Sequence, residues 1–95
     1  MIVINAKFSI KPKKRNEFLA EIKNLIETTK KEDGCLSYQL FESINTENEF
    51  VMIENWQDQQ AVEGHNQSSL LQKLFHSMPE YSSKKSEIVV SKTID

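Results

Sequence analysis

The first ten residues alternate between apolar and polar side chains, with the period of two that is typical of a β-strand. From Pro12 to Lys31 the apolar positions instead recur at the three- and four-residue spacing of an amphipathic helix. Pro12 suits the first turn of that helix, because the backbone N–H that proline lacks would have no helical partner there. Gly34 can end it, since glycine readily adopts a positive φ. The chain therefore begins as a strand followed by a helix.

Two more strands are expected after Gly34. Residues 35–44 alternate again, residues 49–56 do the same, and the segment between them is polar. In the first of these strands, Leu36, Tyr38 and Leu40 are expected to share one face. Both strands carry apolar side chains on both faces, which is expected of a sheet that is covered on both sides.

A second helical region and a last strand complete the pattern. Asp58 is a favourable N-cap, because its carboxylate can accept hydrogen bonds from the first N–H groups of a helix. The apolar periodicity then extends to Pro79 as one or two short helices, and Ser68 and Ser69 suggest a break within this region. A final strand is predicted over about residues 86–94.

The order of elements is β-α-β-β-α-β, which indicates an α+β, ferredoxin-like fold with a four-stranded antiparallel sheet and the helices on one face. The opposite face of this sheet would then expose a large apolar patch, and such patches usually mark interfaces. A second copy of the chain, packed sheet to sheet about a two-fold axis, would cover it. We therefore predict a homodimer. The residues expected on this outer face are Val3, Phe41, Val51, Ile53 and Val89.

Composition excludes several classes of protein. The 95 residues suit one domain, and a net charge of −2 with a single arginine, Arg15, does not suit a nucleic-acid-binding protein. Two glycines cannot build a phosphate-binding glycine-rich loop, and one cysteine excludes disulfides and multi-cysteine zinc sites. With two histidines, an internal metal centre is not expected. No segment looks like a signal peptide or a membrane span, so a cytoplasmic protein without membrane contact is predicted.

Four side chains are the candidates for chemistry between the sheet and the helices. His65 is either a half-buried histidine hydrogen-bonded to a neighbouring strand or a donor or base with a pKa near neutrality. Glu54 shares a mainly apolar strand face with Trp56, so it must be paired, protonated or catalytic. Trp56 is either a core residue or a platform for a ligand, and Tyr38 offers a hydroxyl. The second histidine, His76, is expected to be exposed.

The chain resembles the antibiotic biosynthesis monooxygenase (ABM) domain, in particular small bacterial quinol monooxygenases. The segments that carry this resemblance are IKPKKRNEFL, EDGCLSYQLFES and NEFVMIENWQDQQAVEGHNQS. The last is the most specific, because it holds Glu54, Trp56, Ala61 and His65 in the family's register. The resemblance covers nearly the whole chain, residues 1–95, as one ABM-like domain. It implies a dimeric α+β barrel with a substrate pocket in each subunit.

The resemblance also implies oxygenation without a metal or organic cofactor. An electron-rich phenol or hydroquinone would be deprotonated and would pass an electron to O₂ itself, while the protein supplies orientation, a proton acceptor and a dry cavity. The expected catalytic residues are His65, Trp56, Glu54 and Tyr38. The apolar residues expected to bind the substrate are Phe8, Leu40, Met52 and Phe75.

Other members of the family suggest alternative functions. Haem-degrading relatives carry an asparagine, a histidine and a tryptophan at three positions where this register places Ala6, His65 and Phe75. Asn5 and His76 each lie one residue away from one of these positions. Anthrone oxygenases have an asparagine at the position of Met52. Relatives that handle a phosphorylated sugar derivative are a poor match, because Arg15 lies far along the chain from the pocket residues. A dimeric small-molecule-binding or stress-associated module without catalysis is the main alternative to an enzyme.

Overall fold

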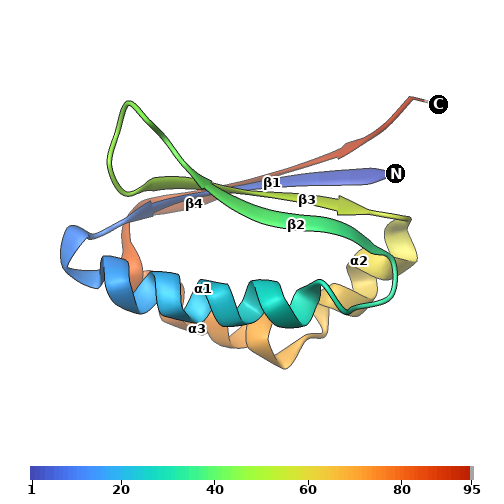
Figure 1. The fold of residues 1–95 in the computed structure, drawn as a ribbon, viewed down its shortest axis with the longest axis horizontal. Coiled ribbons are helices and arrows are strands. Elements are labelled where there is room, and N and C mark those ends of the chain that lie inside the picture. Colours follow the sequence, from blue (N-terminus) through green and yellow to red (C-terminus); the bar gives the residue numbers. More distant parts are fainter. Residues whose placement is uncertain (95) are drawn as a thin grey trace.

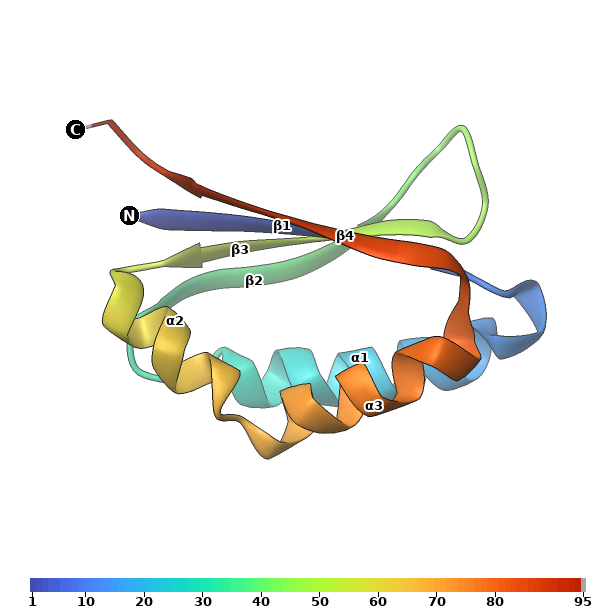
Figure 2. The ribbon, with the colours of Figure 1, turned by 180° about the vertical axis from the view of Figure 1, so that it is seen from behind.

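A four-stranded antiparallel sheet lies over a layer of helices in the structure, a computed structural model that describes residues 1–94 (Figure 1; Figure 2). The strands are β1 (Ile2–Ile10), β2 (Cys35–Glu42), β3 (Glu49–Trp56) and β4 (Ser82–Lys92), in the spatial order β2-β3-β1-β4. The helices are η1 (Pro12–Lys14, a 3₁₀ turn), α1 (Arg15–Thr29), α2 (Gln59–Asn66) and α3 (Ser69–Tyr81). Within residues 1–94, no helix is long and apolar enough to cross a membrane. The predicted ferredoxin-like α+β fold is confirmed.

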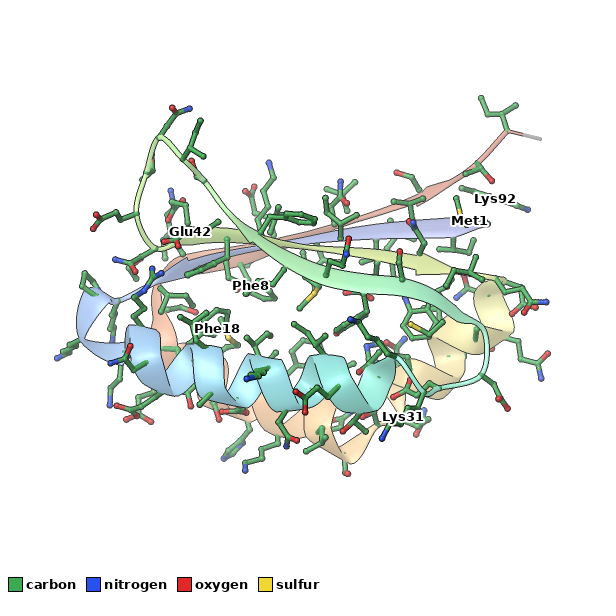
Figure 3. All side chains as sticks on the ribbon, in the orientation of Figure 1. Met1, Phe8, Phe18, Lys31, Glu42 and Lys92 are labelled. Atoms are coloured by element: carbon green, nitrogen blue, oxygen red, sulfur yellow. The ribbon has the colours of Figure 1, made fainter. Side chains whose placement is uncertain are left out.

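The core lies between the inner face of the sheet and the helices. Phe8 of β1 and Phe18 of α1 point toward each other across this layer, with ring centroids 5.7 Å apart in an edge-to-face arrangement (Figure 3). Phe18 also contacts Phe50 of β3 at 5.3 Å and Tyr81 of α3 at 6.2 Å. Burying a side chain such as Phe18 contributes roughly 1.5–3 kcal/mol. This aromatic cluster therefore fixes one end of the helical layer against the sheet.

The predicted break between the two C-terminal helices is confirmed, and each helix has a side-chain cap. Asp58 Oδ1 accepts a hydrogen bond from Ala61 N at 2.9 Å at the start of α2. Ser68 Oγ accepts one from Leu71 N at 3.4 Å at the start of α3. Such caps typically contribute about 1 kcal/mol each. They set the direction of α2, which carries His65.

The prediction that Leu36 shares a face with Tyr38 and Leu40 was wrong. The pairing of β2 with β3 shifts between Cys35 and Ser37, so the alternation of β2 restarts there. Leu36 is 58% exposed, whereas Cys35 packs against the core. The bounds of two strands also differ from the prediction, because β2 ends at Glu42 and β4 runs from Ser82 to Lys92.

The N-terminus of α1 is held by ion pairs, although basic residues are unfavourable at the positive end of a helix dipole. Arg15 donates two hydrogen bonds to the Glu42 carboxylate, at 2.6 and 2.8 Å, and one to Asn48 Oδ1 at 2.9 Å. The same arginine holds the pKa of Glu42 down at about 2. Lys14 Nζ donates to Glu80 Oε1 at 3.0 Å. These tertiary contacts account for Lys14 and Arg15 at this position.

The outer face of the sheet is partly apolar and lacks a covering layer within the described chain (Figure 2). Phe41 is 47% exposed, Ile53 is 36% exposed and Val89 is 55% exposed. Exposed apolar side chains that come from three strands of one sheet face are a feature of interaction surfaces.

Candidate active site

A cavity of about 370 Å³ lies between the sheet and the helices, and we call it the inner cavity. All four strands and the helices α1, α2 and α3 contribute to its lining, which is mainly aliphatic and aromatic. Its polar lining residues are Tyr38, Glu54, His65 and Asn66, and no lysine or arginine among the described residues lines it. Small-molecule sites typically have volumes of roughly 300–1,000 Å³, apolar walls and few polar groups. The inner cavity therefore suits a small, largely apolar molecule with a polar group at one end.

Three of its polar side chains are brought together by strand pairing and by α2. Tyr38 of β2 and Glu54 of β3 are Cα partners in the antiparallel ladder, so their side chains leave the same face side by side. His65 lies in the last turn of α2, with its ring centroid 5.2 Å from that of Tyr38. All three residues are buried, with exposed fractions of 6% or less.

Both ring nitrogens of His65 lie within hydrogen-bonding distance of a side chain. Its Nε2 lies 3.2 Å from the Tyr38 hydroxyl, and its Nδ1 lies 3.0 Å from Glu32 Oε1. A carboxylate can only accept a hydrogen bond, so in neutral His65 the proton is on Nδ1 and Nε2 accepts from the Tyr38 O–H. The result is a continuous chain, Tyr38–His65–Glu32, in which the imidazole is ready to receive a proton at Nε2.

Trp56 supports this chain from the side, although it does not line the inner cavity. It is fully buried, its ring lies 4.7 Å from that of His65 at an interplanar angle of 31°, and its Nε1–H donates to Glu54 Oε1 at 3.0 Å. A rigid indole in this position restricts the His65 ring and orients the Glu54 carboxyl group.

Burial shifts the protonation of all three cavity groups. It raises the pKa of Glu54 to about 7, against the opposing hydrogen bond from Trp56. Burial lowers the pKa of His65, and Glu32 opposes this by its charge and its hydrogen bond. The pKa of the Tyr38 hydroxyl is raised by burial and by the nearby carboxylates of Glu54 and Glu32. Near neutral pH, Tyr38 is therefore protonated, His65 is a base, and Glu54 exchanges between its two forms.

A second hollow, of about 420 Å³, lies on the other side of His65, and we call it the outer hollow. It is lined by Glu32, by neighbouring polar residues of the α1–β2 and β3–α2 connections, and by His65 itself. The Glu32 side chain is 25% exposed. His65 therefore separates an apolar cavity from a polar, solvent-connected one.

The apolar residues expected to bind substrate differ in their placement. Phe8, Met52 and Phe75 line the inner cavity, and Phe75 is 46% exposed near the edge strand β4. Leu40 packs against the core and lies outside the cavity lining. Ile88 and Val90 of β4 line the cavity while being more than half exposed, so the cavity opens between α3 and β4.

Sequence reasoning missed Glu32. It lies 33 residues before His65 in a run of charged residues, Lys30 to Asp33, which has the usual character of a solvated helix end. Nothing in the local pattern distinguishes its carboxylate from its neighbours. Its proximity to His65 depends on how α2 packs against the connection between α1 and β2.

The three positions that correspond to the haem-degrading relatives' residues, Ala6, His65 and Phe75, all line the inner cavity. Asn5 instead belongs to the outer face of the sheet, since it alternates with Ala6 along β1. His76 is exposed on α3. Within residues 1–94, no group of three or more His, Cys, Asp or Glu side chains is placed to hold a metal ion.

Comparisons with known proteins show the family and the fold of the chain. The family model for antibiotic biosynthesis monooxygenases matches residues 1–77. The chain is 43% identical over 72 residues, or 76% of each chain, to a Bacillus subtilis protein named "putative monooxygenase YcnE". A conserved protein from Methanosarcina mazei Go1 superposes with a TM-score of 0.92 at 31% identity, covering 98% of this chain and 92% of that one. A crystal structure described as an antibiotic biosynthesis monooxygenase superposes with a TM-score of 0.91 at 26% identity over the full length of both chains.

Proposed function

Because the chain belongs to the antibiotic biosynthesis monooxygenase family, we propose that it is a cofactor-independent monooxygenase that acts on a small phenol or hydroquinone. The observation that supports this most directly is the position of the Tyr38–His65–Glu32 chain at the wall of an apolar cavity. A base at the wall of an apolar cavity favours removal of a phenolic proton, and the resulting electron-rich anion can reduce O₂.

The absence of lysine and arginine from the described lining bears on the substrate class. A phosphate or carboxylate group would be desolvated in the inner cavity without a cationic partner, which is costly. Glu54 would add repulsion whenever it is ionised. The proposed substrate is therefore uncharged when it enters, with an aromatic body against Phe8, Met52 and Phe75.

In the proposed reaction the substrate supplies all the electrons. The O–H bond of the phenol breaks, its electron pair stays on the substrate oxygen, and its proton is taken up through the Tyr38 hydroxyl at His65 Nε2. One atom of O₂ forms a new C–O bond at a ring carbon, whose C–H bond breaks. The O–O bond also breaks, and the other oxygen atom leaves as water with the proton that His65 returns and a second proton from the substrate. For a hydroquinone, the balance is hydroquinone plus O₂ giving a hydroxylated quinone plus water.

The test is oxygen consumption by chelator-treated protein with a panel of hydroquinones, measured against the same solutions without protein. We expect one O₂ consumed per product, and mass spectrometry with isotope-labelled O₂ should find one labelled atom in each product molecule. Uncharged members of the panel should react faster than carboxylated or phosphorylated ones. If panel members raise the melting temperature while no product forms, the protein is a binding module and the proposed activity is wrong.

We also propose that the protein is a homodimer in which the outer faces of two sheets pack together. The apolar side chains Phe41, Ile53 and Val89 on this face support the proposal, since they belong to three different strands of one surface. Sheets that pack face to face lie about 10 Å apart, so the side chains of the two outer faces would interdigitate.

Ile53→Asp is expected to dissociate this dimer, because it places a carboxylate in the apolar interface without a partner. Analytical ultracentrifugation at micromolar concentration should find a dimer for the wild-type protein and a monomer for the variant. Asn24→Asp is the matched control, since it adds the same charge at an exposed position of α1 in the helical layer. A monomeric wild-type protein, or a dimeric Ile53→Asp variant, would contradict the proposal.

A further inference from the structure

The Glu32 carboxylate reaches His65 from the opposite side to the proposed substrate. It lines the outer hollow, and its Oε1 accepts the hydrogen bond from His65 Nδ1 at 3.0 Å, while His65 Nε2 faces Tyr38 at the inner cavity. Glu32 therefore contacts neither the inner cavity nor a molecule within it, and any effect on a reaction there must act through the imidazole.

We propose that Glu32 is the positioning residue of the site: it fixes the tautomer of His65 that exposes Nε2 to Tyr38, and it stabilises the imidazolium formed when His65 takes the substrate proton. This inference rests on the proposed function for its catalytic part. Its structural part, the control of the His65 ring by Glu32, applies to the protein without substrate.

The backbone around Glu32 holds the carboxylate in place. Glu32 N donates to Thr29 O at 2.9 Å, and Glu32 O accepts from Cys35 N at 3.2 Å. Two residues further on, Gly34 O accepts from Gln57 N at 2.8 Å, which ties the α1–β2 connection to the start of the segment that leads into α2. Because its backbone is anchored on both sides, Glu32 loses little backbone entropy when its side chain binds His65.

The fit between this connection and α2 is close. Gly34 has φ +81°, and a Cβ added to it would lie 2.4 Å from Ala61 Cβ on α2. Only glycine allows this approach without strain. The close approach brings α2, and with it His65, within reach of Glu32.

The charged groups around His65 explain why the Glu32 carboxylate has a large effect on the protonation of His65. Glu32 faces the ring from the α1–β2 connection, Tyr38 from β2 and Glu54 from β3, and Asp33 and Asp58 line the outer hollow. No lysine or arginine among the described residues lines either cavity. Burial lowers the pKa of His65, and Glu32 is the group whose charge and hydrogen bond oppose this effect.

The step that Glu32 assists is a proton transfer and its reversal. The phenolic proton moves to the Tyr38 oxygen as the Tyr38 proton moves to His65 Nε2, and the imidazolium then donates from Nδ1 to the Glu32 carboxylate as a charge-assisted hydrogen bond. When the second oxygen atom leaves as water, the proton returns by the same route. In this step Glu32 stabilises the charge of the imidazolium and does not carry the proton.

Two substitutions test the two parts of the proposal in the full-length protein. Glu32→Gln keeps the shape and an acceptor oxygen but removes the charge, and Glu32→Ala removes the acceptor as well. Glu63→Gln, at an exposed position of α2, is the matched control. Nitrogen NMR of the His65 ring without substrate reports its tautomer and its titration, and the pH dependence of kcat reports its role in turnover.

We expect wild-type His65 to be protonated on Nδ1 when neutral, and Glu32→Ala to lose this single tautomer. Glu32→Gln should lower the pKa of His65, because the stabilising charge is gone. The acidic limb of the kcat profile should then move to lower pH, while the plateau falls by about tenfold or more. Glu32→Asp should recover part of the plateau, since it restores the charge at a greater distance.

The possible failures are distinguishable. An unchanged His65 tautomer in Glu32→Ala together with an unchanged titration in Glu32→Gln would overturn the role of Glu32, whatever the activity. A changed titration with an unchanged kcat profile in Glu32→Gln would overturn its role in the reaction. A wild-type protein that turns over no member of the panel would overturn the proposed function, while the NMR measurements would still report on the Glu32–His65 pair.

Discussion

Replacing His65 by alanine is expected to lower kcat for hydroquinone oxidation by at least about a hundredfold, which is the usual contribution of a positioned acid–base group. The substitution removes the base and separates Tyr38 from Glu32, which contact its two ring nitrogens. Initial rates of oxygen uptake, measured with the substrate that the wild-type protein turns over fastest, give the size of the effect.

Two further variants distinguish a loss of the catalytic group from a loss of folded protein. Tyr38→Phe keeps the buried ring and removes only the hydroxyl that bonds His65, so it should lower kcat with little change in the fold. His76→Ala alters the other histidine, which is exposed on α3, and should leave the rate unchanged. An undiminished rate in a folded His65→Ala protein would exclude His65 as the base.

Replacing Glu54 by glutamine is expected to stabilise the protein at neutral and alkaline pH but not at pH 4. Burial raises the pKa of Glu54 from 4.5 to about 7, so the folded protein holds a proton that the unfolded chain has released. As the pH rises from about 4.5 to 7, ionisation of Glu54 increasingly disfavours the fold, and the cost is complete above pH 7. At about 1.4 kcal/mol per pKa unit, it reaches roughly 3 kcal/mol. Glutamine avoids this cost and still offers an oxygen to Trp56 Nε1.

The difference in melting temperature between Glu54→Gln and the wild-type protein should therefore be small at pH 4 and grow to the order of 10 °C at pH 8. Glu42→Gln is the control with the opposite sign. Arg15 lowers the pKa of Glu42 to about 2, so its stabilising contribution is already complete at pH 5. That variant should be less stable than the wild-type protein by an amount that stays constant between pH 5 and 8. A melting-temperature difference for Glu54→Gln that does not change with pH would contradict a raised pKa for Glu54.

Periodicity was sufficient for the fold because each strand and helix carries its own pattern. The helical region after β3 was predicted from its apolar spacing, with Asp58 as an N-cap and a break at Ser68 and Ser69; the caps at Asp58 and Ser68 are both local interactions. Leu36 was misplaced because the register shift in β2 depends on its pairing with β3, and a one-residue shift moves a side chain to the other face. Strand alternation carries no information about such a shift.

The residues of the candidate site likewise divide into those that the sequence could predict and those that it could not. Tyr38, Glu54 and His65 could be expected to converge, since they are polar residues on otherwise apolar faces that point between the sheet and the helices. Leu40 and Trp56 show the limit of that reasoning, because the correct face does not decide which side chains border a cavity and which fill the space behind it. The contact between Glu32 and His65 depends on how α2 packs against the α1–β2 connection, which is distant in the sequence. No local pattern encodes that packing.

The hydrogen bond from Gln57 N to Gly34 O has a consequence for how the protein fluctuates. Local opening in proteins occurs in small cooperative units, and this bond couples the opening of the α1–β2 connection to that of the entry to α2. The connection cannot swing outward without losing this bond and withdrawing Glu32 from His65. Transient opening at this end of the molecule would therefore leave the His65 imidazole without its counter-charge, and the proposed proton transfer would be slower in the opened molecules.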